Sequence, residues 1–333
     1  MARKAESSNR LDDAARAGWL YYVAGRTQDE IASVMGISRQ SAQRLVSLAM
    51  AERLIKVRLD HPIAACLEMA ARLKEKYDLK HVDVVPSDPG SQSTTVGIAE
   101  AGAAEIERWL KSVEPVVLAI GTGRTLKATI DQLPSMECPQ HRIVSLTGNI
   151  RLDGSAAYYN VIFSMADTIK ARHFPMPLPV LVSSPEEREV LHKQSLVQIA
   201  LELGAEADAA FVGVGELGPD APLCEDGFLA RDEMARLMAA GAAGEICGWM
   251  FDHEGVLLPD SINERVASVP LPPRDRASVI GIAKGRRKYE ALRAALKGRI
   301  INGLVTDEAT ADYLLRVLDR AAGRGTAASA SFS

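Results

Sequence analysis

From residue 63 onward the sequence alternates short apolar runs with longer amphipathic stretches, and this alternation constrains the fold more than any other feature. The apolar runs are rich in Val, Ile, Leu and Ala and predict buried strands, while helical periodicity separates most of them. The predicted strands are 81–85, 116–120, 142–146, 209–214, 245–249, 279–282 and 301–305. The predicted helices are 63–77, 96–111, 125–132, 156–171, 187–203, 231–240, 286–296 and 307–322. This order is typical of an α/β domain built on a mostly parallel sheet.

Composition bounds the organisation of the chain. Its 333 residues are enough for about two domains, and 47% hydrophobic with 25% charged residues is ordinary for a soluble globular protein. The net charge is −4, yet residues 1–58 contain ten basic and six acidic residues, which makes this segment about +4. Because phosphate binding needs only a local basic excess, an acidic whole does not exclude a nucleic-acid-binding segment.

Cysteine spacing and hydropathy exclude two further classes. The four cysteines lie far apart, so we expect buried reduced thiols and no metal site. No apolar run is long enough to span a membrane, and the polar residues 1–8 lack the apolar core of a signal peptide. We therefore expect a cytoplasmic protein with no membrane partner and no cofactor.

Residues 28–45 have the pattern of two short helices joined by a tight turn. Thr27 and Glu30 have the spacing of a capping box, and Gly36 stands where a positive φ is needed. Ser38 is then placed to cap the second helix. The inner side carries Ile31, Ala32, Met35, Ile37, Ala42, Leu45 and Val46. Agreement between several independent positions favours a helix-turn-helix over an ordinary helical hairpin.

The outer side of the second helix carries side chains that recognise DNA. Arginine pairs with guanine, glutamine with adenine, and serine hydroxyls or backbone amides bind phosphate. Their place at the start of the second helix matches the docking of such motifs in the major groove. With two residues at the start of the first helix, the expected DNA-facing set is Thr27, Gln28, Arg39, Gln40, Ser41, Gln43 and Arg44.

Segments on either side complete a small N-terminal domain. Residues 11–24 predict a preceding helix, and residues 54–59 alternate apolar and basic side chains, as a short strand or extended wing would. One stripe of the preceding helix carries Leu11, Ala15, Trp19 and Tyr22. The expected divisions are a flexible N-terminus (1–10), a helix-turn-helix DNA-binding domain (11–60), an α/β domain (63–321) and a disordered tail (322–333).

A glycine-rich turn follows the predicted strand 116–120. The sequence Gly121-Thr122-Gly123-Arg124-Thr125 leads into a predicted helix, where backbone amides bind anions and glycines allow a ligand to approach closely. Its hydroxyls and guanidinium suit a phosphate or a polyhydroxylated ligand. Leu126 occupies the third glycine position of the dinucleotide fingerprint, so no dinucleotide is expected. A purely structural turn is an equal alternative.

Three other positions are ambiguous from the residues alone. Residues 213–218 match G-x-G-x-x-G literally, but the prolines that follow cannot open a long helix, which leaves only a ligand-lining turn. Asp252 follows a predicted strand, where its carboxylate either binds sugar hydroxyls or caps the local backbone. Lys288 stands near the start of a helix and either reaches an anionic ligand or stays solvated.

Together these segments resemble the SorC family of bacterial sugar-responsive regulators, often grouped with the DeoR-type regulators. The resemblance extends over about residues 11–318. It is carried by residues 28–45, 120–125, 146–149, 213–215, 251–252 and 302–311, of which the last block is the most distinctive. It implies a Rossmann-like effector domain, similar to sugar-phosphate isomerases and deaminases, behind a winged helix-turn-helix domain.

The resemblance also implies homo-oligomers, dimers or tetramers, whose DNA affinity is set by a sugar, sugar phosphate or polyol. In the family the G-x-G-x-T turn cradles the phosphate or equivalent oxygens of the ligand. Carried over residue by residue, the implied effector-binding set is Gly121, Thr122, Gly123, Arg124, Thr125, Gly148, Asn149, Asp252 and Lys288. Asn149 and Lys284 stand where the family often has glycine, so the ligand of a relative cannot simply be transferred.

Three functions of different classes follow from these features. The favoured one is a transcriptional regulator of a carbohydrate or polyol catabolic operon, with operator DNA and a carbohydrate effector as partners and no catalytic residues. The alternative is a sugar-phosphate isomerase- or deaminase-like enzyme with an accessory DNA-binding domain, and a third is a constitutive DNA-binding protein. Because fold does not imply function and no acid–base pair is evident near Gly121, the residues favour the regulator.

Overall fold

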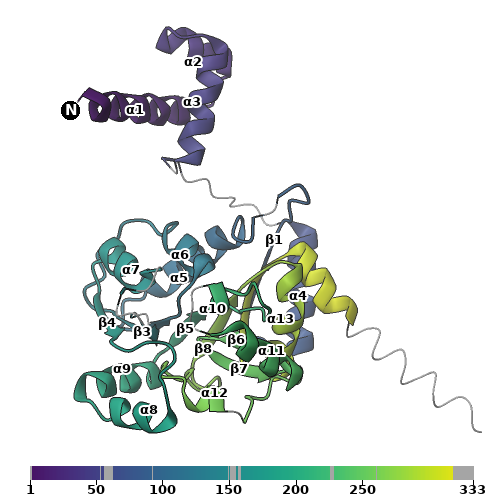
Figure 1. Cartoon of the computed structure of the whole chain (residues 1–333). Coiled ribbons are helices and arrows are strands. Elements are labelled where there is room, and N and C mark those ends of the chain that lie inside the picture. Colours follow the sequence, from purple (N-terminus) through teal and green to yellow (C-terminus); the bar gives the residue numbers. More distant parts are fainter. Residues whose placement is uncertain are drawn as a thin grey trace, which may run out of the picture. The chain divides into compact units, whose positions relative to one another are not determined.

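The computed structural model describes residues 2–52, 54–55, 63–91, 93–148, 150, 155–156, 159–225, 229–259 and 261–317. The chain divides into two compact units, residues 1–61 and 62–333 (Figure 1). Three predictions fall largely or wholly outside the described residues: most of the wing at 54–59, the tail at 322–333 and the effector-binding role of Asn149.

Three helices form the first unit. They are α1 (Ala2–Tyr22), α2 (Gln28–Met35) and α3 (Arg39–Ala51). The predicted capping box is confirmed, because Glu30 N donates to Thr27 Oγ1 and Thr27 N donates to Glu30 Oε2. Gly36 ends α2 with a φ of 66°, and the Ser38 hydroxyl accepts from Ser41 N at 3.1 Å. Local capping interactions therefore define the turn between α2 and α3.

The face of α1 that packs in this unit is not the predicted aromatic stripe. Ala17 and Gly18 are buried, whereas Trp19 is 54% and Tyr22 is 41% exposed. A Cβ atom on Gly18 would lie 2.8 Å from the Ala49 Cβ of α3, so this seam admits only small side chains. The helix also includes residues 2–10, expected to be flexible, since this segment is rich in residues of good helix propensity.

A seven-stranded parallel sheet forms the centre of the second unit, in the order β1-β9-β8-β5-β2-β3-β4. Its strands are β1 (His81–Val85), β2 (Val117–Ile120), β3 (Arg142–Gly148), β4 (Arg172–Met176), β5 (Ala209–Val212), β8 (Ser278–Ile282) and β9 (Gly303–Asp307). A separate antiparallel hairpin consists of β6 (Ala242–Ile246) and β7 (Trp249–Asp252). The predicted α/β architecture with a mostly parallel sheet is confirmed.

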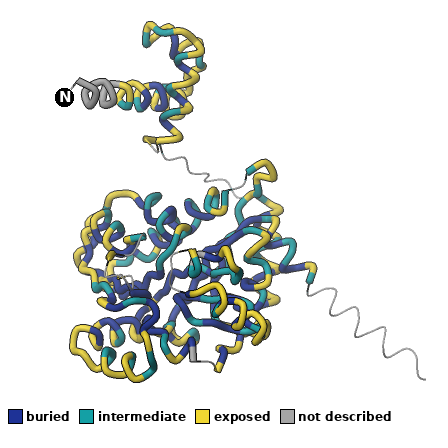
Figure 2. Tube along the Cα trace, viewed as in Figure 1, coloured by how far each residue is buried: buried dark blue, intermediate teal, exposed yellow. Residues whose placement is uncertain are grey.

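Helices cover both faces of this sheet, so that buried strands lie between more exposed layers (Figure 2). One layer contains α5 (Ile98–Leu110), α6 (Arg124–Ile130) and α7 (Val161–Ile169). The other contains α4 (Ala64–Tyr77), α9 (Ser195–Ala205) and α13 (Tyr289–Lys297). Within β2, Leu118 and Ile120 face the first layer, while Val117 and Ala119 face the second, as strand pleating requires.

Shorter helices connect these layers to the hairpin. They are α8 (Pro185–His192), α10 (Pro222–Glu225), α11 (Arg231–Ala239), α12 (Ser261–Glu264) and the 3-10 helix η1 (Arg286–Lys288). Residues 308–317 after β9 are also helical. The single helix predicted at 187–203 is therefore divided between α8 and α9.

Two strand predictions differ from the structure for identifiable reasons. No prediction covers β4, whose sequence contains basic residues and Pro175, and such a strand is tolerated because it lies at the sheet edge. The strand predicted at 245–249 is instead split by a hairpin turn. Cys247 and Gly248 have φ values of 54° and 87°, and two successive left-handed residues are typical of a tight hairpin.

We expect Gly18→Val to destabilise the first unit by about 1–3 kcal/mol, because the added atoms would overpack the seam with α3. Urea unfolding followed by circular dichroism would measure the change. The matched control is Ser33→Val, which adds the same side chain at an exposed position of α2. Equal stability of the two variants would show that the close approach at Gly18 does not matter.

Candidate functional site

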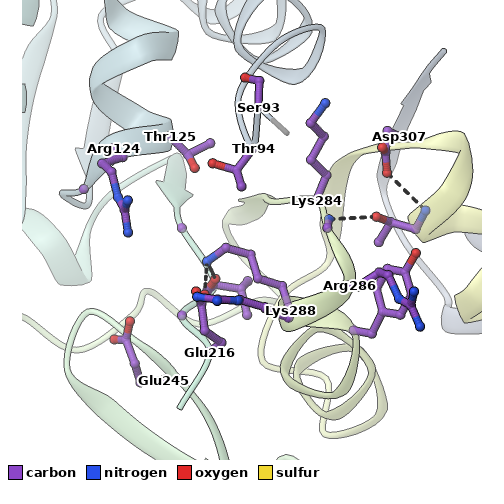
Figure 3. Close-up of a pocket in the computed structure, with 18 of the residues that line it drawn as sticks. Ser93, Thr94, Arg124, Thr125, Glu216, Glu245, Lys284, Arg286, Lys288 and Asp307 are labelled. Carbon is purple, nitrogen blue, oxygen red and sulfur yellow. Dashed lines mark hydrogen bonds and ion pairs between the residues drawn. The ribbon is translucent and has the colours of Figure 1, made fainter. Parts of the chain in front are cut away.

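A cavity of about 770 Å³ opens at the carboxyl ends of the parallel strands. Its lining comes from the carboxyl ends of the parallel strands and the segments that follow them, including the one after β4, and from the β6–β7 hairpin. Ten of these side chains are labelled in Figure 3: Ser93, Thr94, Arg124, Thr125, Glu216, Glu245, Lys284, Arg286, Lys288 and Asp307. Charged groups of both signs and hydroxyl groups therefore line one open cavity.

The topology of the sheet explains why the cavity lies here. The sheet continues from β2 to β3 on one side and from β5 to β8 on the other, so the segments after β2 and β5 diverge. Ligands of open α/β sheets bind at such a switch point. The two segments remain tied at their base, where Gly121 N donates to Phe211 O at 2.9 Å.

The glycine-rich turn after β2 supplies one wall of the cavity. Thr122, Gly123, Arg124 and Thr125 line it, and the exposed Arg124 contributes a guanidinium. Gly123 has a φ of 114°, which strongly favours glycine. The Thr122 hydroxyl is already used, because it donates to a backbone carbonyl at 3.0 Å. Gly121 lies beneath this wall and is not among the lining residues.

An ion pair lies on the adjacent wall, where Lys288 and Glu216 meet (Figure 3). Lys288 Nζ is 2.7 Å from Glu216 Oε2 and donates to Val214 O at 2.6 Å. Burial opposes the ionisation of Glu216, but the Lys288 ammonium outweighs it and holds the pKa of Glu216 below its usual range. Glu216 is thus ionised at neutral pH, and its charge neutralises that of Lys288.

Glu245 brings a second carboxyl group to this wall from the hairpin. Its carboxylate occupies the space that a Cβ atom on Gly215 would fill, and it accepts from Gly248 N at 2.9 Å. Desolvation raises the pKa of Glu245 and outweighs the Gly248 hydrogen bond and the Lys288 charge, which lower it, while the nearby Glu216 charge raises it further. Two neighbouring carboxyl groups therefore have pKa values shifted in opposite directions.

The remaining effector-binding predictions have different outcomes. Gly148 lines the cavity beside Thr147, whose buried hydroxyl has no hydrogen-bond partner among the described residues. Asp252 is not among the lining residues. Its carboxylate accepts from the amides of Glu254 and Val256, each at 2.9 Å, which is the local capping that the sequence left as its alternative role. The structure therefore does not bring Asp252 to the cavity.

The predicted DNA-facing residues lie on the first unit. Arg39, Gln40, Gln43 and Arg44 are exposed on α3, and Gln28 is half-buried at the start of α2. The hydroxyls of Thr27 and Ser41 are engaged in the caps of α2 and α3. A shallow groove along α3 is lined by Arg10, Gln40, Gln43, Arg44, Ser47, Leu48 and Ala51. Arg10 of α1 thus joins a surface that the sequence pattern assigned only to α2 and α3, and Ser47 extends that surface along α3.

Sequence reasoning missed several cavity residues as candidates. Glu216 lies in the glycine-rich turn 213–218, and Glu245 lies in the strand that was predicted at 245–249. The available signal for both residues was a charged side chain next to a strand end. Among the described residues, no cluster of three or more His, Cys, Asp or Glu side chains could hold a metal ion. In the same part of the chain, no helix is both long and apolar enough to cross a membrane.

The opposite pKa shifts predict opposite effects of two conservative substitutions. Glu245→Gln should raise the Tm at pH 7, because the folded state then no longer holds a desolvated carboxylate, and this gain should shrink toward pH 4.5. Glu216→Gln should lower the Tm at pH 7, because it removes the charge that neutralises Lys288. That loss should also shrink as the pH falls through the pKa of Glu216.

Differential scanning fluorimetry from about pH 3 to pH 8 would measure both effects, with about 2–4 °C expected for each kcal/mol in a domain of this size. Shifts of the same sign in the two variants would contradict the assignment of the two carboxyl groups.

Comparisons with known proteins agree with this geometry. Residues 61–316 match the family described as "Putative sugar-binding domain". The chain is 31% identical over 302 residues to the erythritol catabolism regulatory protein EryD of Brucella abortus, covering 91% of this chain and 96% of EryD. It is 31% identical over 311 residues to the transcriptional regulator LsrR of Escherichia coli O139:H28, covering 92% of this chain and 95% of LsrR.

Solved structures show the same architecture. The full-length sorbitol operon regulator SorC of Klebsiella pneumoniae superposes with a TM-score of 0.66 at 25% identity, covering 92% of this chain and 99% of that one. A DeoR family regulator of Listeria monocytogenes, at 23% identity and a TM-score of 0.67, covers 75% of this chain and shares the fold. This chain belongs to the SorC family of transcriptional regulators that carry a sugar-binding domain.

Proposed function

We propose that this protein regulates a carbohydrate or polyol catabolic operon, and that a sugar, sugar phosphate or sugar alcohol in the cavity sets its affinity for operator DNA. The observation that carries the proposal is the cavity at the switch point, where glycine turns, cations, carboxylates and hydroxyls converge. Such a mixture of donors and acceptors matches a polyhydroxylated ligand. Two relatives are named for regulators of erythritol catabolism and of a sorbitol operon, which supports this ligand class.

Each wall of the cavity has a distinct proposed part in recognition. The turn at 121–125 holds a phosphate or equivalent oxygens, with Arg124 and the Thr125 hydroxyl as donors. Glu216 and Glu245 accept hydrogen bonds from ligand hydroxyls, while Lys288 keeps Glu216 ionised. We place Gly148 in the ligand contact surface and leave Asp252 out of it. The ligand is bound and released without turnover, as suits a regulator.

The first unit is the proposed DNA-binding part of the regulator. Arg39, Gln40, Gln43 and Arg44 enter the major groove as the exposed side of α3, with the cap residues of α2 against the phosphate backbone. A homodimer or tetramer would bind two or more half-sites at once. Effector binding would bias the oligomer between arrangements with different half-site spacing, and a coupling of about 1–3 kcal/mol changes DNA affinity about 5–150-fold.

We expect Arg44→Ala to weaken binding to the operator, because it removes an exposed guanidinium from the DNA-facing side of α3. A lost base contact would cost about 5–150-fold in affinity, and a lost phosphate contact would reduce the salt slope by about one. Fluorescence anisotropy with DNA from upstream of the protein's own operon, at several salt concentrations, would separate the two. Arg236→Ala is the control, since it removes an exposed arginine from α11 of the second unit. If the wild-type protein binds no fragment of this region at low salt, the proposed function is wrong.

We expect a thermal-shift panel of sugars, polyols and their phosphates to contain a stabilising compound that also changes DNA affinity. A ligand at 100 times its Kd would stabilise the protein by about 2.7 kcal/mol. Gly123→Ala should abolish this shift, because alanine is strained at a φ of 114°. Gly241→Ala is the control, because it introduces the same kind of backbone strain, at a φ of 96°, in a residue that does not line the cavity. Conversion of the stabilising compound to a product would instead support the enzyme alternative.

A further inference from the structure

Lys284 is a buried cation that the proposed recognition does not use. It follows β8, is only 6% exposed and lines the cavity. Its ammonium donates to Val96 O at 2.8 Å. An ammonium carries three N–H donors, so this backbone carbonyl uses only one of them.

The charge of Lys284 lacks a counter-ion among the described residues. No carboxylate oxygen there lies within 4.0 Å of Lys284 Nζ, whereas Lys288, four residues later, pairs with Glu216 at 2.7 Å. Asp307 also lines the cavity, but its carboxylate accepts from the Ser87 hydroxyl at 2.9 Å and from Thr310 N at 3.1 Å. Buried charges are normally paired, because removing an ion from water is costly. Lys284 therefore makes no direct ion pair among the described residues, because the Asp307 carboxylate is hydrogen-bonded to Ser87 and Thr310 instead.

The surroundings of this ammonium are suited to an oxyanion. Val96 N donates to the Ser93 hydroxyl at 3.2 Å, which places the ammonium beside the polar turn that precedes α5. Ser93 and Thr94 line the same part of the cavity (Figure 3). Arg124 enters from β2, on the other side of β5 from the β8 segment that carries Lys284. Cationic groups thus reach the cavity from two different strands.

We propose that Lys284 binds an anionic oxygen group of the effector, so that the effector of this protein carries a negative charge at each end. One end, a phosphate, lies at the turn 121–125, as the proposed function assumes, and the inference rests on that function. The other end, a carboxylate or a second phosphate, forms a charge-assisted hydrogen bond with Lys284 Nζ. A sugar-acid phosphate or a sugar bisphosphate has this chemistry, whereas a neutral polyol does not.

A purely structural lysine would instead serve to hold Val96 and the turn before α5. Lys284→Met separates the two roles, because methionine keeps most of the apolar stem but carries no charge. A structural role predicts a lower Tm without ligand and equal ligand-induced shifts. The binding role predicts that one class of ligand loses affinity more than another.

The experiment compares matched pairs of probes on the full-length protein. Aldose phosphates of four, five and six carbons are paired with the corresponding aldonate phosphates, and fructose 6-phosphate is paired with fructose 1,6-bisphosphate. Affinities come from thermal shift and isothermal titration calorimetry at constant ionic strength. In at least one pair, we expect the wild type to bind the compound with an anionic group at both ends about 10–100-fold more tightly than its partner. Preference within the aldonate pairs identifies a carboxylate, and preference within the fructose pair identifies a second phosphate.

Lys284→Met should remove this preference and leave the affinity for the partner with a single anionic group within about threefold. Lys193→Met is the control for net charge, since Lys193 lies on the surface outside the cavity and pairs with the exposed Glu189. Equal binding of both members of every pair by the wild type, or a preference that survives in Lys284→Met, overturns the Lys284 proposal and leaves the regulator intact. Absence of binding by every probe, together with a positive response to a neutral polyol, also overturns it. Absence of any response to either class refutes the proposed effector function itself.

Discussion

Parallel pairing between β2 and β5 is the interaction on which the rest of the second unit depends. Leu118 lies opposite Ala209 and Ile120 opposite Phe211, so both strands end at the same level. The segments that follow then diverge at one height, and the cavity forms between them. A slip of one residue would turn Leu118 and Ile120 toward the wrong helical layer. Burial of these apolar side chains therefore fixes the register of the strands, and this register determines where the cavity forms.

The charged groups of the cavity differ in how far their charges are compensated by neighbouring groups. The charge of Lys288 is compensated by Glu216, whereas desolvation raises the pKa of Glu245 above its usual value. Desolvation of these groups strengthens every electrostatic interaction that a ligand makes there. The donors and acceptors of the cavity are therefore already desolvated in the folded protein before a ligand binds.

Most of the fold could be predicted from the sequence, because buried parallel strands and capped helices leave strong local signals. The strand 81–85 and the caps at Thr27 and Ser38 match the structure. The predictions fail where tertiary packing, rather than local sequence, determines the structure. The hairpin turn at Cys247 lacks the usual Asn-Gly or Asp-Gly signal, and in α1 the close approach at Gly18 places aromatic residues outside. For the site, the turn 121–125 was evident, but Glu216, Glu245 and Lys284 come from three distant segments that only the topology unites.

Two glycines, Gly215 in the cavity lining and Gly121 beneath it, each lie against a side chain of the β6–β7 hairpin. A Cβ atom on Gly121 would lie 3.3 Å from Cys247 Sγ, and one on Gly215 would overlap the Glu245 carboxylate. A larger residue at position 215 would displace the Glu245 carboxylate, and one at position 121 would press on Leu126 as well as Cys247. Evolution of ligand preference is therefore constrained to coordinated changes: among relatives, positions 215 and 245, and positions 121, 126 and 247, should vary together rather than independently.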